Sequence, residues 1–162
     1  MAQQKKYEFV PGDEKVVAPG RTVKRIRALI AIAALGVAPG ELGGYIESEG
    51  NLQQVSGNAW VSGNAWVYGD AQVYGNAWVY GDARVKSQTD WLLVGPAKSS
   101  GRFTTAYRDT KIGVRVSCGC FTGTAQEFSA QIEATHAGNQ QHLQQYRLFC
   151  QLIAFSFDIQ PA

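Results

Sequence analysis

The sequence predicts a mainly β protein, in which a short coil of strands lies between an N-terminal β cap and a C-terminal α+β unit. Three observations lead to this fold class. Residues 55–84 consist of five six-residue repeats in a row, without a gap, and Val85 follows in the same pattern. Strand-like stretches separated by Pro-Gly turns precede the repeats. The end of the chain carries a helix-start signal followed by apolar residues at helical spacing.

Each repeat predicts a short strand and a bend. The run reads VSGNAW, VSGNAW, VYGDAQ, VYGNAW, VYGDAR and a final Val. Within a unit, Ala-x-Val-x alternates small aliphatic side chains with larger ones, which is typical of a strand with two different faces. The Gly-Asn or Gly-Asp pair that follows tolerates positive φ and marks a sharp change of direction.

Two arrangements of these strands are open. Gly-Asn loops occur in hairpins, so an antiparallel meander remains an alternative. A coil that bends the same way at every corner better explains strands this short and corners this uniform. Three bends of about 120° close a triangle, so residues eighteen positions apart would stack about 4.8 Å apart. Val and Ala would then fill the inside, and the aromatic residues would lie outside.

An eighteen-residue register gives chemically sensible neighbours. It stacks Trp60 on Trp78, Trp66 on Arg84 and Tyr68 on Lys86, and the last two pairs suit cation–π contact. It also stacks Val55 on Val73, and Val73 on Trp91. We therefore expect the coil to extend a little beyond the clean repeats at both ends.

The N-terminal segment predicts a small β cap over the first coil. Residues 7–10 and 22–32 are expected to be strands, with turns at residues 11–13 and 19–20 between them. A cover is needed there because an open coil end exposes unpaired backbone groups.

The C-terminal segment predicts two strands and two helices. The strands are expected at residues 103–108 and 112–118, and Thr124 with Glu127 forms a capping box that starts the first helix. The second helix is expected over residues 140–155, and a stripe for packing is included among its apolar positions Leu143, Tyr146, Leu148, Phe149, Leu152 and Ile153. The predicted domains are the N-terminal β cap at 1–50, the coil at 51–92, and the strands plus two helices at 93–162.

Composition narrows the class of protein. The net charge of +2 is too small to indicate a nucleic-acid polymer as partner. Three cysteines, an odd number, and the lack of a signal-peptide pattern favour the reducing cytoplasm. The most apolar run, residues 28–38, is eleven residues long and too short to span a membrane.

The repeats resemble the hexapeptide repeat of left-handed parallel β-helices. The resemblance implies a left-handed coil and a homotrimer, and many proteins of that fold are acyltransferases. Segments 7–9, 25–29, 42–46 and 118–136, together with the repeats, further resemble small hexapeptide-repeat proteins encoded by phages and prophages. That second resemblance covers nearly the whole chain and implies no settled activity. The apolar run 30–35 departs from it, since a more polar stretch is expected there.

The residues for acyl transfer are poorly placed. Acyltransferases of this fold use a histidine base between subunits and a groove for coenzyme A along the coil. The repeats contain no histidine, and the two in the chain, His136 and His142, lie in the predicted helical segment. We expect no cofactor.

A metal or nucleophile site is also weakly indicated. Cys118, Cys120 and His136 are weak candidates for a metal site, with His142 and Cys150 as further donors, but Cys-x-Cys alone is not a common zinc spacing. Small buried cysteines and a histidine near a helix end are the plainer interpretation. A Cys120–His136 nucleophile pair would lack a third, orienting group.

The aromatic surface is the main candidate site. The predicted ligand or partner surface consists of Trp60, Trp66, Trp78, Tyr68, Tyr74, Tyr80, Arg84 and Lys86, whose rings should all point outward. Such rings pack on the protein's own cap or sister subunits, or they stack on a planar ligand or a protein partner. Arg25 and Arg27 form a possible anion contact, with a solvated strand face as the plainer interpretation.

These observations favour a non-catalytic, homotrimeric binding or assembly module, expected to be a phage accessory protein that binds a host protein or a ligand. The first alternative is a protein that sequesters a nucleotide-like small molecule and so interferes with host defence. The second alternative is a hexapeptide-repeat acyltransferase.

Overall fold

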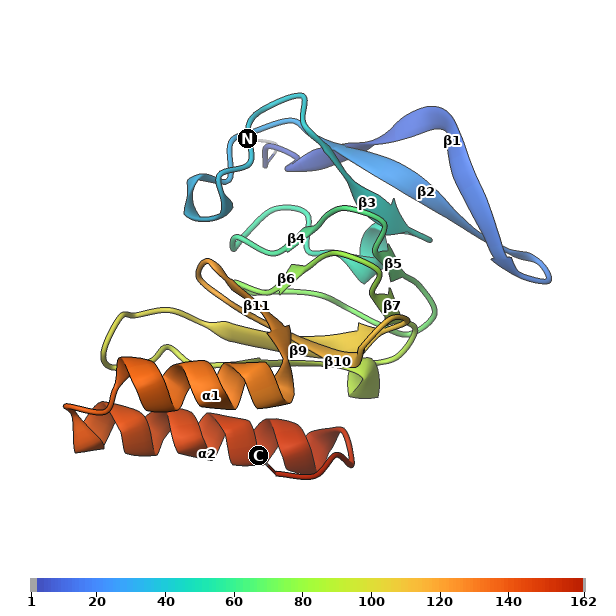
Figure 1. Cartoon of the computed structure of the whole chain (residues 1–162). Coiled ribbons are helices and arrows are strands. Elements are labelled where there is room, and N and C mark those ends of the chain that lie inside the picture. The colour runs from blue at the N-terminus through green and yellow to red at the C-terminus, as the bar shows by residue number, and fades with distance from the viewer. Residues whose placement is uncertain (1–2, 162) are drawn as a thin grey trace. The chain divides into compact units, whose positions relative to one another are not determined.

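The computed structural model describes residues 3–161 and divides the chain into two compact units, Met1–Gln88 and Thr89–Ala162. The first unit holds strands β1 to β7, and the second holds strands β8 to β11 with helices α1 and α2 (Figure 1). As predicted, the fold is mainly β and contains two α-helices near the end of the chain. No helix in the described part of the chain is long and apolar enough to cross a membrane.

Two sheets form the first unit. The larger has the order β1-β2-β3-β5-β7, with bounds Tyr7–Ala18, Arg21–Ala28, Leu42–Ile46, Trp66–Val67 and Arg84–Val85. The smaller pairs β4 (Trp60–Val61) with β6 (Trp78–Val79). Pairing is antiparallel from β1 to β3 and parallel from β3 to β7 and between β4 and β6. The N-terminal strands therefore continue one sheet of the repeats.

The eighteen-residue register of the repeats is confirmed. Trp60 pairs with Trp78, and Trp66 pairs with Arg84, both in parallel. The corners are confirmed as well, because Gly57, Gly63, Gly69, Gly75 and Gly81 have φ of 68°, 64°, 62°, 69° and 72°. Side chains with a Cβ rarely adopt this conformation, so glycine at each corner sets the period of the coil.

The inside of the repeats is the predicted column of small aliphatic side chains. Its members are fully buried: Ala59, Val61, Ala65, Val67, Ala71, Val73, Ala77, Val79, Ala83 and Val85. Val55 was predicted to continue this column, and that prediction is wrong, because its side chain is 48% exposed. Leu52, fully buried, pairs with Val73 instead. The register offset is 21 residues at Tyr45–Trp66 and at Leu52–Val73 but 18 at Trp60–Trp78, so three additional residues between Leu52 and Trp60 leave Val55 outside the column.

The N-terminal strands differ from the prediction at two points. The first strand continues through residues 11–13, where Gly12 has φ of 79° and the register with β2 shifts, so the Pro-Gly signal marks an irregularity within a strand. The second strand ends at Ala28. Residues after it form a loop with a 3-10 helix at Ala33–Leu35 and a bridge between Ile32 and Val37.

Two glycines allow β3 to approach the repeats. A Cβ at Gly43 would lie 2.8 Å from Cζ2 of Trp60 and 2.7 Å from the carbonyl oxygen of Val61. A Cβ at Gly44 would lie 2.8 Å from the carbonyl oxygen of Ala65. Any larger residue would push β3 off the coil, so the Gly-Gly pair brings the N-terminal strands into the sheet.

The second unit is a four-stranded antiparallel sheet with two helices on it (Figure 1). The strands are β8 (Trp91–Val94), β9 (Thr104–Asp109), β10 (Gly113–Cys118) and β11 (Phe121–Thr124), in the order β11-β10-β9-β8. The helices are α1 (Ala125–Thr135) and α2 (Gln140–Ser156). The predicted capping box is confirmed, because Thr124 Oγ1 accepts from the Glu127 backbone N–H and Glu127 Oε2 accepts from that of Thr124.

The apolar positions predicted for α2 do include a buried stripe. Its buried residues are Leu143, Tyr146, Phe149, Ile153 and Ala154, and they join Phe128 and Ile132 of α1 and Val116 of β10 in one core. Leu148 and Leu152, the other apolar positions named for this helix, are 52% and 42% exposed. The helix is therefore apolar on two sides, and only one of them packs on the sheet.

Candidate functional site on the repeats

A row of cationic and aromatic side chains crosses the larger sheet. Arg25 pairs with Tyr45 between β2 and β3, Tyr45 with Trp66 between β3 and β5, and Trp66 with Arg84 between β5 and β7. Side chains of directly paired residues share a face of a sheet. The structure therefore brings Arg25, predicted as an anion contact, into one row with Trp66 and Arg84 of the predicted aromatic surface.

Cation–π contacts connect the members of this row. The guanidinium carbon of Arg84 lies 3.7 Å from the centre of the Trp66 ring, which confirms the predicted contact. Tyr45 receives the guanidinium carbon of Arg25 at 4.3 Å and Nζ of Lys15 at 4.7 Å from its ring centre. Contacts of this kind contribute about 0.5–1 kcal/mol each at exposed sites, so the row stabilises the sheet modestly.

The guanidinium of Arg25 is already engaged. Its Nε donates to Asp13 Oδ2 at 3.1 Å, its Nη1 to the Gly43 carbonyl at 2.8 Å and its Nη2 to the Tyr45 hydroxyl at 2.7 Å. Hydrogen bonding from Arg25 lowers the pKa of the Asp13 carboxyl below its usual value. An anion that bound at Arg25, as predicted, would have to compete with the Asp13 carboxylate for the guanidinium group.

Arg27 is paired in a similar way. Its Nε donates to Glu8 Oε1 at 2.9 Å, and its Nη2 donates to the same oxygen. Glu8 and Arg27 lie opposite each other in the register of β1 and β2. The pair links the two strands on the surface, and an added anion would compete with Glu8.

Trp60 does not lie on the predicted surface. Its side chain is 0% exposed, so at this position the ring packs within the chain, which is the first of the alternatives given for the outward rings. Gly43 of β3 lies directly against its Cζ2 edge, and the ring of Tyr7 lies 6.4 Å away in an edge contact. Residues of both β1 and β3 therefore lie against the indole, which no repeat motif signals.

The other predicted rings keep different degrees of exposure. Trp78 and Tyr80 are half-buried and pack together with ring centres 4.5 Å apart, and Trp78 Nε1 donates to Ser62 Oγ at 3.0 Å. Tyr68 is half-buried and Lys86 is exposed. Tyr74 is 52% exposed and follows Val73 directly, opposite the segment that leads from Leu52 to the exposed Val55. Within residues 55–85, Val55 and Tyr74 are the most exposed large apolar residues.

The cysteines and histidines lie in the second unit and do not gather. Cys118 ends β10, and Cys120 lies exposed in the turn before β11. The His136 ring stacks on the Tyr146 ring with their centres 4.9 Å apart. The centre of the His142 ring lies 5.9 Å from that of His136. Within residues 3–161, no three His, Cys, Asp or Glu side chains come together to hold a metal ion.

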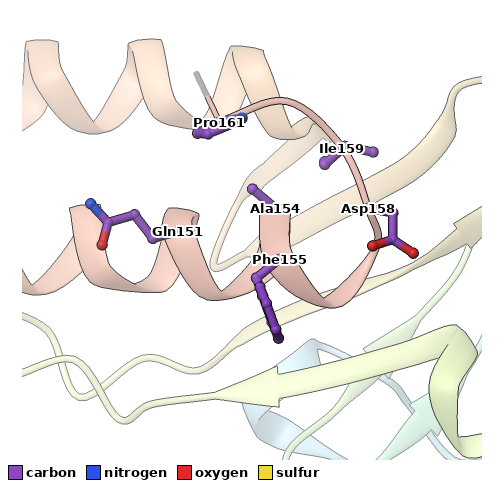
Figure 2. Close-up of a pocket in the computed structure, with 6 residues that line it drawn as sticks. All are labelled: Gln151, Ala154, Phe155, Asp158, Ile159 and Pro161. Atoms are coloured by element: carbon purple, nitrogen blue, oxygen red, sulfur yellow. The ribbon is translucent and has the colours of Figure 1, made fainter.

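A cavity of ≈ 310 Å³ lies at the end of α2 (Figure 2). Asp158 has φ of 52°, in the left-handed region that Asp tolerates better than most residues, and it turns the chain back after the helix. The lining residues are Gln151, Ala154, Phe155, Asp158, Ile159 and Pro161. Asp158 is the single ionisable group among them, so the lining offers no pair of groups for acid–base catalysis.

Comparison with known families supports the repeat architecture. The family model described as the YdcK beta solenoid repeat matches residues 54–69 and 71–86. The matched segments coincide with the coil of short parallel strands, and together they identify a β-solenoid repeat. No curated protein and no solved structure matches the chain.

Proposed function

We propose that this chain is a non-catalytic assembly module, in which the repeats form a left-handed β-solenoid that associates as a homotrimer and binds a protein partner. The proposal extends to a cytoplasmic phage or prophage accessory protein whose partner is a host protein. The left-handed sense and the phage setting rest on the hexapeptide-repeat resemblance, since the general preference for strand crossovers favours the right-handed sense.

The observation that carries the proposal is the pair of exposed apolar side chains on the repeats. Tyr74 is 52% exposed and Val55 is 48% exposed, whereas the guanidinium groups of Arg25, Arg27 and Arg84 are held by bonds within the unit. Water contact at Tyr74 and Val55 costs roughly 25 cal/mol per Å² of apolar surface, which association recovers. The surface therefore suits a protein neighbour better than an anionic ligand.

The cysteines and histidines support a non-catalytic role. Burial raises the pKa of the Cys150 thiol to about 11, so it is protonated and a poor nucleophile at neutral pH. His136 is packed flat against Tyr146. A catalytic Cys–His pair needs a thiolate and a base within hydrogen-bond reach of it, oriented by a third group.

Stacking of a nucleotide on the repeats is less favoured. Arg84 occupies one face of Trp66 at 3.7 Å and donates through Nη1 to the Asn64 carbonyl at 2.9 Å. A base that stacked on that face would have to displace this guanidinium. Tyr74, by contrast, is 52% exposed to solvent.

The first prediction is that Tyr74→Glu dissociates the trimer. A carboxylate in an apolar subunit interface would be desolvated without a partner, which is strongly unfavourable. Light scattering after size exclusion should give three times the chain mass of 17.6 kDa for the wild type and that single mass for the variant.

Val16→Glu is the matched control for this prediction. Val16 is 75% exposed on β1 and lies outside the repeats, so the same charge there should leave the mass at three chains. A monomeric wild type, or a Tyr74→Glu variant that stays trimeric, would contradict the proposal.

A further inference from the structure

Helix α2 exposes a second apolar stripe that its own unit does not cover. Leu148, Leu152 and Phe155 are 52%, 42% and 84% exposed. Their spacing of four and three residues places them along one side of the helix. Tyr146 and Phe149 face the core from the other side. The Phe155 ring points away from Ala154 and Pro161, so it does not fill the cavity beside it (Figure 2).

The stripe carries no charge. Helix α2 contains a single Asp, Glu, Lys or Arg residue, Arg147. Arg147 forms a bidentate ion pair with Glu133 of α1, in which Nε lies 2.7 Å from Oε1 and Nη2 lies 2.8 Å from Oε2. Exposed glutamines, Gln144 and Gln151, flank the leucines. Solvent-facing sides of helices are usually rich in charged residues, so this composition indicates a contact surface.

An uncharged surface of this kind is complementary to itself. In a two-fold contact the same patch meets its own copy, so any charge within it would face a like charge. Glutamine avoids this problem, because each amide both donates and accepts hydrogen bonds and pairs with another glutamine. The four-and-three spacing of Leu148, Leu152 and Phe155 is also the spacing of the seam between two packed helices.

We infer that α2 packs against α2 of a second copy of this chain, antiparallel and about a two-fold axis, with Leu148, Leu152 and Phe155 as the buried seam. This contact is separate from the proposed three-fold contact of the repeats, so it doubles the number of chains in whatever assembly the repeats form. One helix on each side gives a small interface, below about 1,200 Å² in total, which is typical of weak association. The contact should therefore form in the micromolar range and depend on protein concentration.

The test is the double variant Leu148→Glu with Phe155→Glu. Sedimentation equilibrium should show, at high protein concentration, half the wild-type mass for this variant. Both side chains are largely exposed, so circular dichroism and the thermal midpoint should change little. The control is Gln131→Glu with Ala134→Glu, which adds the same charges to exposed positions of α1 and should keep the wild-type mass.

The two association surfaces give different mass ratios. Loss of the α2 contact changes the mass twofold, whereas loss of the repeat contact through Tyr74→Glu changes it threefold. A wild-type mass equal to that of the α2 variant at every concentration would overturn the α2 contact and would leave the trimer proposal unaffected. A twofold loss accompanied by unfolding would also overturn it, since the seam would then be part of the core of one chain. Phe155→Gln, which adds no charge, should weaken the association without changing the fold.

Discussion

Trp60→Ala should lower the free energy of unfolding by about 3–5 kcal/mol, the range for truncating a fully buried Trp. The indole has 0% exposure, and its surroundings cannot close the space easily. On one side β3 is held against it at Gly43, and on another the Tyr7 ring is fixed by a hydrogen bond from its hydroxyl to the Leu52 carbonyl at 2.7 Å. Chemical denaturation followed by circular dichroism measures the change.

Trp78→Ala is the control for this substitution, because Trp78 is the same residue one coil later and pairs directly with Trp60. Its indole is half-buried and packs on Tyr80. Truncation there should cost about 1–2 kcal/mol, since less area leaves water on folding. Equal effects at the two positions would contradict the view that the N-terminal strands cover the first coil.

Lys6→Met should stabilise the protein by about 3 kcal/mol at neutral pH. Lys6 is 3% exposed, and its Nζ is buried without a hydrogen-bond partner in the described part of the structure. The backbone on both sides is fixed, since Lys6 N–H donates to Gln54 Oε1 at 2.7 Å and the Leu29 N–H donates to the Lys6 carbonyl at 2.8 Å. These bonds hold the Lys6 backbone in place, and methionine fills the space of the buried side chain without a charge.

The gain in the free energy of unfolding from Lys6→Met should shrink as the pH rises. Burial lowers the pKa of the Lys6 amine from 10.5 to about 8, so the unfolded chain binds the proton more tightly than the folded one. The buried charge of Lys6 lowers the free energy of unfolding by its full amount below pH 8. This loss of stability disappears as the pH rises from about 8 to 10.5. The stability difference between variant and wild type should therefore shrink over that window, in paired urea titrations at pH 7 and pH 10.5.

Lys5→Met provides the control at the neighbouring position. Lys5 has a side chain that is 59% exposed and forms a surface ion pair with Glu49 at 2.8 Å. Its loss should change stability by at most about 1 kcal/mol. If Lys6→Met destabilises the protein at pH 7, or if its effect is the same at both pH values, the Lys6 amine has a partner or a path to water in the folded chain.

Features that repeat along the chain could be predicted from the sequence. The period, the glycine corners and the Ala and Val column follow from local conformational preference and from side-chain size, which act within a few residues. The capping box at Thr124 and Glu127 and the helix that begins at Gln140 were predictable for the same reason. Each of these signals is complete within the segment that it describes.

The candidate site could be predicted only in part. The Trp66–Arg84 contact follows from the period, because both residues belong to the repeats. Arg25 and Tyr45 lie in the same row because β2 pairs with β3 and β3 pairs with β5. No spacing of residues in the sequence predicts these two pairings. Asp13 and Glu8, which engage the two arginines, also come from a strand whose register shifts at an irregularity.

Sequence alone determined the architecture of the repeats, because a coil of identical units is specified by glycine at each corner and a small aliphatic residue at each inward position. Only the tertiary structure decided which of the outward residues reach water. Trp60 and Trp78 occupy the same place in their units, yet Trp60, with Tyr7 of β1 and Gly43 of β3 against it, is fully buried, whereas Trp78 is half-buried. The same holds on α2, where Phe149 is buried and Phe155 is exposed because the sheet covers a single side of the helix. Burial depends on which distant segment arrives, and that is a property of the whole packed unit.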